Sequence, residues 1–333
     1  MRNLLVSIRI KGLIALATTA LLVLGACGGG GDSGEKETIM FAGLNWDSAQ
    51  VQNAVARYII ENGYEYPTDH IEGATIPLFQ GLLKGEIDVN MEIWLPNQQA
   101  VWDEAVKKGQ VISVGKSLED NWQSSWIIPA YTAEANPGLV KVSDIPDYVD
   151  LFTEPDSGGK AVLIGCIAQW ACRGVEEDQI VAYGLEDVVE LRDPGDMGGL
   201  NAAITGAYKK EQDLLFYYWG PTKLANELDM VLLEEPASGD CALPNDGCAF
   251  PAAEILIAVT PAMADKAPDV IKFFRNWDWD ADNQLSAESW LADNKDAHKD
   301  YYNQTAIWYL SNNEAWKAWV PAEIAEKVVE ALG

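Results

Sequence analysis

The chain has 333 residues, 48% of them hydrophobic, which is enough for two lobes of ordinary size or one large α/β unit. Its formal net charge of −28 excludes a basic nucleic-acid-binding face, so we expect no nucleic-acid partner. With 13 tryptophans and only 2 histidines, aromatic rings far outnumber the side chains that most often act as general bases.

The first 26 residues predict a signal peptide. Three basic residues precede an uncharged, mostly apolar stretch, residues 12–26, which is too short for a transmembrane helix. This stretch leads into the sequence LGAC, which resembles a bacterial lipobox, so we expect Cys27 to be lipidated. Residues 27–37 are rich in glycine and polar residues and predict a flexible tether. The alternative is an ordinary signal peptide whose cysteine is incidental.

The chain after the tether alternates short apolar runs with helical periodicity. Residues 39–44, IMFAGL, predict a strand, and Asp47 predicts the N-cap of the helix that follows. A second helix is predicted to end at Gly85. The alternating run IDVNMEI, residues 87–93, predicts the next strand. This order of strand, helix and strand predicts a mainly parallel sheet with both faces covered.

The middle of the chain contains further apolar runs. Residues 124–131 predict a crossing into a second lobe, and residues 161–165 and 213–218 predict strands of that lobe. The stretch from about 175 to 191 between these two strands predicts a helix. Residues 254–260 predict the strand that returns to the first lobe, and the remainder of the chain is predicted to be helical.

Four tryptophans lie at the ends of predicted strands: Trp46, Trp94, Trp170 and Trp219. In an open α/β sheet the ligand crevice lies outside the carboxyl ends of the strands, so we expect these rings to meet there. Tryptophan rings attract quaternary ammonium groups through the ring quadrupole, which predicts a box for a methylated cation. Glu92 is a candidate anion for this site, although alternation places it on the face opposite Met91 and Ile93.

The segment GCIAQWACRG, residues 165–174, joins a predicted strand to a predicted helix and carries Trp170. The backbone N–H groups of Ala171 and Cys172 would lie near the helix N-terminus, which favours anions. One loop would then offer an aromatic wall for a cation and donors for a carboxylate. That combination suits a small zwitterion.

Export changes how the cysteines are interpreted, because the exterior of the cell favours disulfides. Apart from the predicted lipidation site, the chain contains Cys166, Cys172, Cys241 and Cys248. Proximity favours the pairs Cys166–Cys172 and Cys241–Cys248 among three possible connectivities. A zinc site is the alternative, and it is opposed by the absence of a histidine near any of these cysteines in sequence.

Enzyme signatures are scarce. The sequence has no G-x-S-x-G elbow, no P-loop and no H-E-x-x-H motif, and its two histidines are isolated from each other. Asp278, Asp280 and Asp282 have the spacing that begins an EF-hand, but Asn283 stands where that motif needs glycine, so we interpret them as a solvated acidic turn. We therefore expect no metal and no cofactor, and an exported enzyme is a minor alternative.

The loop GCIAQWACRG resembles the disulfide-bridged tryptophan loop of the glycine betaine/proline betaine-binding proteins of ABC importers. The segments NMEIWLP (90–96) and FYYWGP (216–221) are similar to the other two tryptophan segments of that family. The resemblance implies an α/β, type II periplasmic-binding-protein fold, with two lobes joined by a hinge and the ligand cleft between them.

Together with the order of strands, the resemblance predicts the domain organisation. We expect lobe 1 to comprise residues 38–125 and 256–333, and lobe 2 to comprise residues 126–255. We also expect a monomeric solute receptor, not an enzyme, that works with the permease of an ABC importer. It would touch the membrane only through its lipid and would lie at the outer face of the cytoplasmic membrane or in the periplasm.

Carried over by position, the resemblance assigns Trp94, Trp170 and Trp219 to the ammonium box. The backbone of Ala171 and Cys172 would then hold the carboxylate of the ligand. The remaining strand-end tryptophan, at position 46, would add a fourth wall.

One position departs from the family pattern. The members that this chain most resembles carry a histidine four residues after the first box tryptophan, where this chain has Gln98. A glutamine donates only a neutral hydrogen bond to the carboxylate of a ligand. A ligand without a carboxylate, such as trimethylamine N-oxide or choline, is therefore the alternative. A receptor for another compact cation or an amino acid is a further alternative, but an aromatic ammonium site favours a methylated nitrogen.

Overall fold

The computed structural model describes residues 36–119, 123–236, 248–250 and 252–333. The predicted signal peptide, Cys27 and most of the predicted tether lie outside these ranges, so export and lipidation stay predictions. Within the described ranges, no helix has the length and apolar character needed to cross a membrane.

The first of two five-stranded sheets has the strand order β2-β1-β3-β10-β4. Strands β2 and β3 pair with β1 in parallel, and β10 pairs antiparallel with both β3 and β4. Only β10 therefore runs against the others, which refines the predicted mainly parallel sheet. The strands are β1 (Ile39–Leu44), β2 (Thr68–Gly73), β3 (Val89–Leu95), β4 (Ile112–Lys116) and β10 (Glu254–Val259).

The second sheet has the order β7-β6-β8-β5-β9, and here β5 is the reversed strand. The two sheets share one plan, in which the fourth strand in spatial order comes from the part of the chain that crosses between them. We call each sheet with its helices a lobe. The strands of the second sheet are β5 (Gln123–Pro129), β6 (Ala161–Ile164), β7 (Val189–Arg192), β8 (Leu215–Gly220) and β9 (Met230–Leu232).

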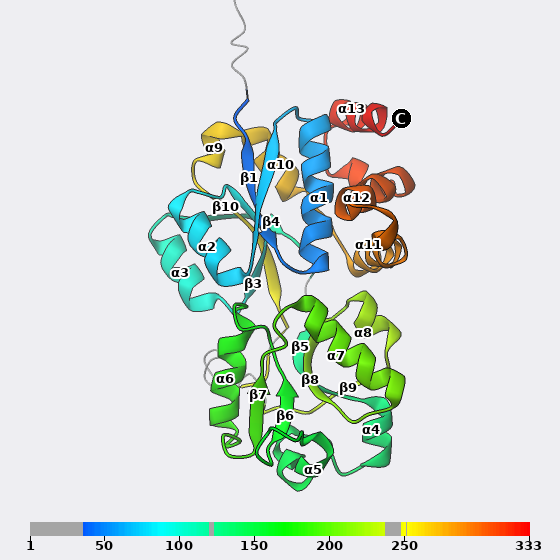
Figure 1. The fold of residues 1–333 in the computed structure, drawn as a ribbon. Coiled ribbons are helices and arrows are strands. Elements are labelled where there is room, and N and C mark those ends of the chain that lie inside the picture. The colour runs from blue at the N-terminus through cyan, green and yellow to red at the C-terminus, as the bar shows by residue number, and fades with distance from the viewer. Residues whose placement is uncertain (1–35, 120–122, 237–247, 251) are drawn as a thin grey trace, which may run out of the picture. The chain divides into compact units, whose positions relative to one another are not determined.

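Helices cover both faces of each sheet. In the first lobe, α1 lies on one face and α2 and α3 lie on the other (Figure 1). The helices of this lobe are α1 (Asp47–Asn62), α2 (Thr75–Lys84), α3 (Gln99–Lys107), α9 (Met263–Lys266), α10 (Pro268–Arg275), α11 (Ala281–Asn294), α12 (Tyr301–Asn312) and α13 (Ala322–Leu332), with short 3₁₀ helices η4 (Lys295–Ala297) and η5 (Ala315–Ala318).

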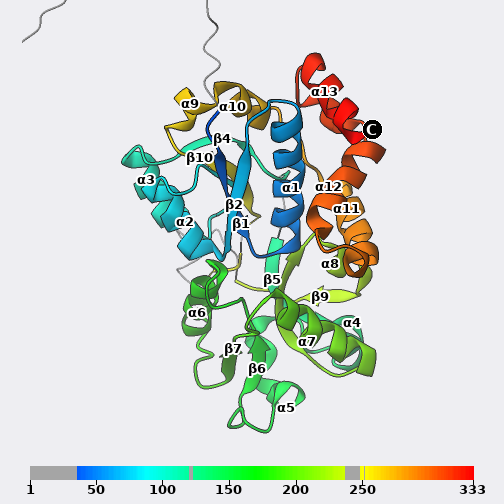
Figure 2. The ribbon, with the colours of Figure 1, turned by 45° about the horizontal axis from the view of Figure 1, so that its top comes forward.

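The second sheet lies between α6 and α7, an arrangement that is also visible in the turned view (Figure 2). The helices of this lobe are α4 (Ala130–Ala135), α5 (Val149–Phe152), α6 (Cys172–Ala182), α7 (Met197–Lys210) and α8 (Lys223–Glu227), with the 3₁₀ helix η1 (Val142–Asp147). The predicted lobe boundaries at 125/126 and 255/256 fall inside β5 and β10, and the division into lobes by residue number stays a prediction.

Several local predictions hold for stated physical reasons. The helix α2 ends at Gly85 because that residue adopts a left-handed φ of 75°, which favours glycine. All seven residues of β3 are buried, as a central strand requires when helices cover both faces of its sheet. This strand begins at Val89, two residues later than the apolar run suggested.

Two local predictions are wrong. The N-cap of α1 is Trp46 and not Asp47, and the Gln50 side chain donates to the Leu44 carbonyl at 2.8 Å. The helix predicted over residues 175–191 ends at Ala182, and its last residues form β7. The glycine at position 184 has a φ of 67°, which interrupts the helix, and the apolar run that follows is too short for periodicity to separate strand from helix.

A group of tryptophans from the C-terminal part of the chain lies in the core of the first lobe. We call Trp277, Trp279, Trp316 and Trp319 the core tryptophan cluster; each is at most 5% exposed. The Trp277 and Trp279 rings stack with an interplanar angle of 14° and a centroid distance of 5.7 Å. Their burial at close range predicts a stabilising role for this cluster.

Candidate functional site

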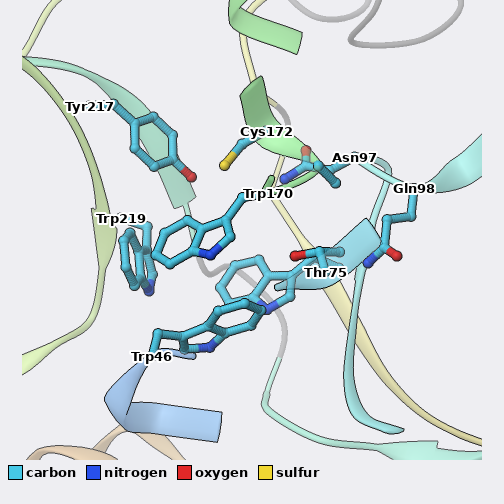
Figure 3. Close-up of a pocket in the computed structure, with 10 residues that line it drawn as sticks. Trp46, Thr75, Asn97, Gln98, Trp170, Cys172, Tyr217 and Trp219 are labelled. Carbon is cyan, nitrogen blue, oxygen red and sulfur yellow. The ribbon is translucent and has the colours of Figure 1, made fainter. Parts of the chain in front are cut away.

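The four strand-end tryptophans line one cavity, as the sequence predicted. Trp46 follows β1, Trp94 lies near the end of β3, Trp170 lies in the loop after β6, and Trp219 lies near the end of β8. The space between the lining residues is about 370 Å³, counting the part that is open to solvent. The other residues that line it are Thr75, Asn97, Gln98, Ala171, Cys172 and Tyr217 (Figure 3).

We call Trp46, Trp94, Trp170 and Trp219 the tryptophan box. Two neighbouring pairs of its rings stand at steep angles to one another. Trp46 and Trp170 meet edge to face at 5.1 Å and 70°, and Trp170 meets Trp219 at 5.4 Å and 76°. Figure 3 shows Trp170 between the other two rings. Perpendicular rings form adjacent walls, so their electron-rich faces can surround one group.

Glu92 lies behind two of these rings and is fully buried. Its Oε2 accepts the indole N–H of Trp46 at 2.8 Å and that of Trp94 at 2.9 Å. Its Oε1 accepts the Ser48 hydroxyl at 3.2 Å and the Gln52 amide at 2.9 Å. Burial raises the pKa of Glu92 to about 7, and these four hydrogen bonds act in the opposite direction. The carboxylate therefore ties the orientation of two box rings to helix α1.

The other two rings use their N–H groups differently. The indole N–H of Trp170, on the second lobe, donates to the Asn45 side chain of the first lobe at 2.8 Å. The indole N–H of Trp219 has no hydrogen-bond partner within the described residues, although the ring is only 5% exposed. The box thus draws its walls from both lobes and keeps one buried donor available.

The loop of residues 165–174 has the predicted disulfide. Cys166 and Cys172 are bonded, with their Cα atoms 5.9 Å apart, so Trp170 is held within a closed loop. The helix α6 begins at Cys172, and no backbone hydrogen bond within the described residues uses the N–H groups of Ala171 or Cys172. Both residues line the cavity, which places the open donors of a helix N-terminus beside the aromatic walls.

The second predicted disulfide lies partly outside the described residues. Cys248 is disulfide-bonded, but Cys241 falls in the range 237–247, which the structure does not describe. The pairing Cys241–Cys248 therefore stays a prediction.

Gln98 lies at the N-terminal end of α3 and lines the cavity, as its sequence position suggested. The side chain is 5% exposed, and its Nε2 donor has no partner within the described part of the chain. A buried amide without a partner is costly, so this group favours a ligand that brings an acceptor.

Sequence reasoning missed three lining residues: Thr75, Asn97 and Tyr217. Tyr217 could have been found, because it lies two residues before Trp219 in β8 and strand alternation places both on one face. Its hydroxyl lies 3.1 Å from that of Ser124, and burial raises the pKa of the phenol well above its usual range. No sequence signal pointed to the other two.

Metal ligands are not gathered anywhere in the described ranges: no group of three or more His, Cys, Asp or Glu side chains there could hold an ion. The acidic turn near residue 280 has a structural role. Asp280 caps α11, where its side chain accepts the N–H of Asn283 at 2.8 Å.

A cavity that two α/β lobes form together, walled by aromatic rings and lined by open backbone donors, defines a protein that binds small solutes. The chain belongs to the OpuAC family, described as the substrate binding domain of ABC-type glycine betaine transport systems, whose model matches residues 37–312. This is a family of solute receptors, not of enzymes.

Two curated relatives are similar over part of their length. A glycine betaine/proline betaine-binding periplasmic protein of Escherichia coli K12 is 27% identical over 192 residues, which are 54% of this chain and 58% of that protein. The glycine betaine-binding periplasmic protein OusX of Dickeya dadantii is 32% identical over 142 residues, 39% of this chain and 42% of that protein. The matched region therefore spans less than two thirds of either relative.

Solved structures confirm the predicted type II fold. A choline-binding ABC-transporter protein in complex with choline has a TM-score of 0.72 at 20% identity, covering 89% of this chain and 98% of that one. ProX from Borrelia burgdorferi has a TM-score of 0.71 at 19% identity, covering 87% and 99%. Lactococcal OpuAC, closed on glycine betaine, has a TM-score of 0.67 at 16% identity, covering 86% and 100%.

Proposed function

We propose that this protein is the extracytoplasmic solute receptor of an ABC importer and that it binds a small methylated ammonium solute, with glycine betaine as the leading candidate. The observation that carries the proposal is the cavity lined by four buried tryptophans from both lobes. Membership of the OpuAC family supports the same class of ligand.

The walls of the cavity suit a methylated nitrogen better than an ordinary ammonium group. Each desolvated cation–π contact is worth about 1–2 kcal/mol, and three such contacts with a few hydrogen bonds give about −8 kcal/mol, or a Kd of about 1 μM. An unmethylated ammonium would lose its hydrogen bonds to water among the rings without replacement. The walls therefore select for a cation that carries methyl groups instead of N–H donors.

The donors around the cavity favour a ligand that also carries an anionic end. The Nε2 of Gln98 and the N–H groups of Ala171 and Cys172 are all open toward a ligand acceptor. A carboxylate can accept several of them at once, whereas the hydroxyl of choline can accept fewer. This observation supports a betaine over the alternatives without a carboxylate, choline and trimethylamine N-oxide.

The proposal also covers the transport partner of the receptor and its location. An ABC permease in the membrane would receive the ligand from a monomeric receptor, and a lipid on Cys27 would hold that receptor at the outer face of the membrane or in the periplasm. The order of apolar stretch, cysteine and glycine-rich tether supports the anchor.

Tryptophan fluorescence and calorimetry test the proposal with a panel of glycine betaine, choline, trimethylamine N-oxide and glycine. We expect glycine betaine to bind in the micromolar range, choline more weakly, and glycine at least about a hundredfold more weakly than glycine betaine. Absence of binding by every methylated compound would contradict the proposed function. Tighter binding of choline than of glycine betaine would leave the aromatic box in place and overturn the assignment of the carboxylate donors.

A further inference from the structure

The carboxylate of Glu92 forms hydrogen bonds with two rings of the tryptophan box and with two side chains of α1. A single oxygen of its carboxylate accepts the indole N–H groups of Trp46 and Trp94, which come from two different strand ends. The other oxygen accepts Ser48 and Gln52 from α1. All four partners can donate, and the two indole N–H groups and the Gln52 amide can only donate, so the contacts are strongest when the carboxylate is ionised.

We propose that Glu92 is the positioning residue of the tryptophan box, and that binding of a cation there is coupled to the release of its proton. This inference rests on the proposed function, because it needs a cationic ligand. It adds a pH-dependent control of affinity to the aromatic walls.

Among the described residues, no cationic side chain acts on the charge of Glu92. Its hydrogen-bond partners are all neutral. A cation in the box would lie across the indole rings from this carboxylate, in a buried region where charges are weakly screened. The hydrogen bonds from the indole N–H groups to an anion also polarise the rings toward the ligand. The ionised carboxylate therefore stabilises the bound cation both through space and through the rings.

The surrounding charges do not replace this role. On α11, the carboxyl of Glu288 is near enough to interact with that of Glu92, and burial raises its pKa to about 7 as well. On α1, Asp47 lies 3.7 Å from the ammonium of Lys295 and accepts the Tyr302 hydroxyl. The two strands that pair with β3 place little further charge near Glu92. Strand β1 has no charged residue. In β10 only Glu254 is charged, and it is exposed and lies 3.7 Å from Lys116.

The sign of the pH effect follows from these contacts. Burial raises the pKa of Glu92 to about 7 in the ligand-free protein, so the carboxyl is mostly protonated at about pH 6 and mostly ionised at about pH 8. Protonation removes the negative charge from the group that both indole N–H groups face, which weakens these two hydrogen bonds and the attraction for a cation in the box. A bound cation favours the ionised form and lowers the pKa. Affinity should therefore fall as the pH falls through 7, and binding at about pH 6 should release a proton.

Calorimetry of glycine betaine tests the inference, because the charge of the trimethylammonium group does not change in this range. Titrations at about pH 6, 7 and 8, each in two buffers of different ionisation enthalpy, report affinity and proton release together. We expect Kd to rise about tenfold from pH 8 to pH 6, with release of about one proton at pH 6. Binding that is independent of pH and of the buffer would overturn the inference and leave the proposed function standing. Absence of binding at every pH would overturn both.

Variants assign the proton to its source. Glu92→Gln replaces one acceptor oxygen by a donor amide, so we expect binding about tenfold weaker at pH 8 and no proton release. Glu235→Gln is the matched control: this half-buried glutamate of the second lobe also has its pKa raised to about 7 by burial, but it contacts Ser125, Gln179 and Tyr183 and not the box. It should keep the pH profile of the parent.

If proton release persists in Glu92→Gln and disappears in Glu288→Gln, the proton comes from Glu288. That result would refute the inference. If Glu92→Gln does not fold, the two-buffer titration of the parent still shows whether ligand binding releases a proton and weakens as the pH falls.

Discussion

The tryptophan box and the core tryptophan cluster are both made of buried tryptophan rings, but only the box rings line the cavity described above. The box rings are 4–9% exposed and the cluster rings 0–5%, so burial barely separates them. Their surroundings differ more. Box rings meet at 70° and 76° around a cavity, although Trp219 also stacks on Tyr218 at 28°. In the cluster, Trp277 and Trp279 stack at 14°, and Trp319 packs against them at 41° and 55°.

The partners of the indole N–H groups differ in charge. In the cluster, Trp277 donates to the Ser117 carbonyl and Trp279 to the Gln284 side chain, both neutral acceptors. In the box, two indoles donate to the carboxylate of Glu92 and one has no partner within the described residues. If the box binds a ligand as proposed, the two groups differ in the cavity, the charged acceptor and the open donors, and not in exposure.

Alanine substitutions should separate the two regions most clearly. Trp279→Ala removes a ring that is 2% exposed, so we expect the free energy of unfolding to fall by about 3–5 kcal/mol with no change in ligand affinity for the folded protein. Trp170→Ala removes one wall of the box, so affinity for glycine betaine should fall at least about tenfold. Chemical denaturation and calorimetry on both variants measure the two effects.

Trp170→Phe is the matched control, because it keeps an aromatic face, although a smaller one with a weaker quadrupole, and loses the hydrogen bond to Asn45. We expect its affinity to lie between those of the parent and Trp170→Ala. The distinction between box and cluster is wrong if Trp170→Ala binds like the parent, or if Trp279→Ala loses affinity while it remains folded.

A smaller effect should follow from Gln98, whose side-chain donor has no partner within the described residues. At about pH 6 a protonated histidine in Gln98→His would donate a charge-assisted hydrogen bond, which is roughly twice as strong as a neutral one. Relative to the parent at the same pH, we expect several-fold tighter binding of glycine betaine. For choline, which has no carboxylate, the substitution should give no gain or a loss. Equal affinity of both proteins for glycine betaine from about pH 5.5 to pH 8 would show that position 98 does not face the ligand.

Much of this site could be predicted because strand ends are easy to find and their geometry is fixed. The apolar runs that became β1, β3 and β8 placed three of the box tryptophans, and the loop sequence placed Trp170 and the disulfide. Parallel pairing brings the ends of β1 and β3 to one edge of the first sheet, and those of β6 and β8 to one edge of the second.

Other features depend on contacts between distant segments, which one sequence does not reveal. The hydrogen bonds of Glu92 link β3 to α1 and to the residue that follows β1, so alternation alone left its partners unknown. The end of α6 at Ala182 was missed because a short apolar run can be a helix or a strand, and pairing with β6 decided in favour of β7.

The most direct test of the account compares glycine betaine with 3,3-dimethylbutanoate, in which carbon replaces the quaternary nitrogen. The two compounds have nearly the same shape and the same carboxylate, so their affinities differ mainly through the positive charge in the box. We expect calorimetry at about pH 8 to show that the carbon analogue binds at least about a hundredfold more weakly, which corresponds to the loss of roughly 3 kcal/mol of cation–π attraction. Affinities within about threefold of each other would mean that the rings select for shape alone, and would contradict the account of a cation site.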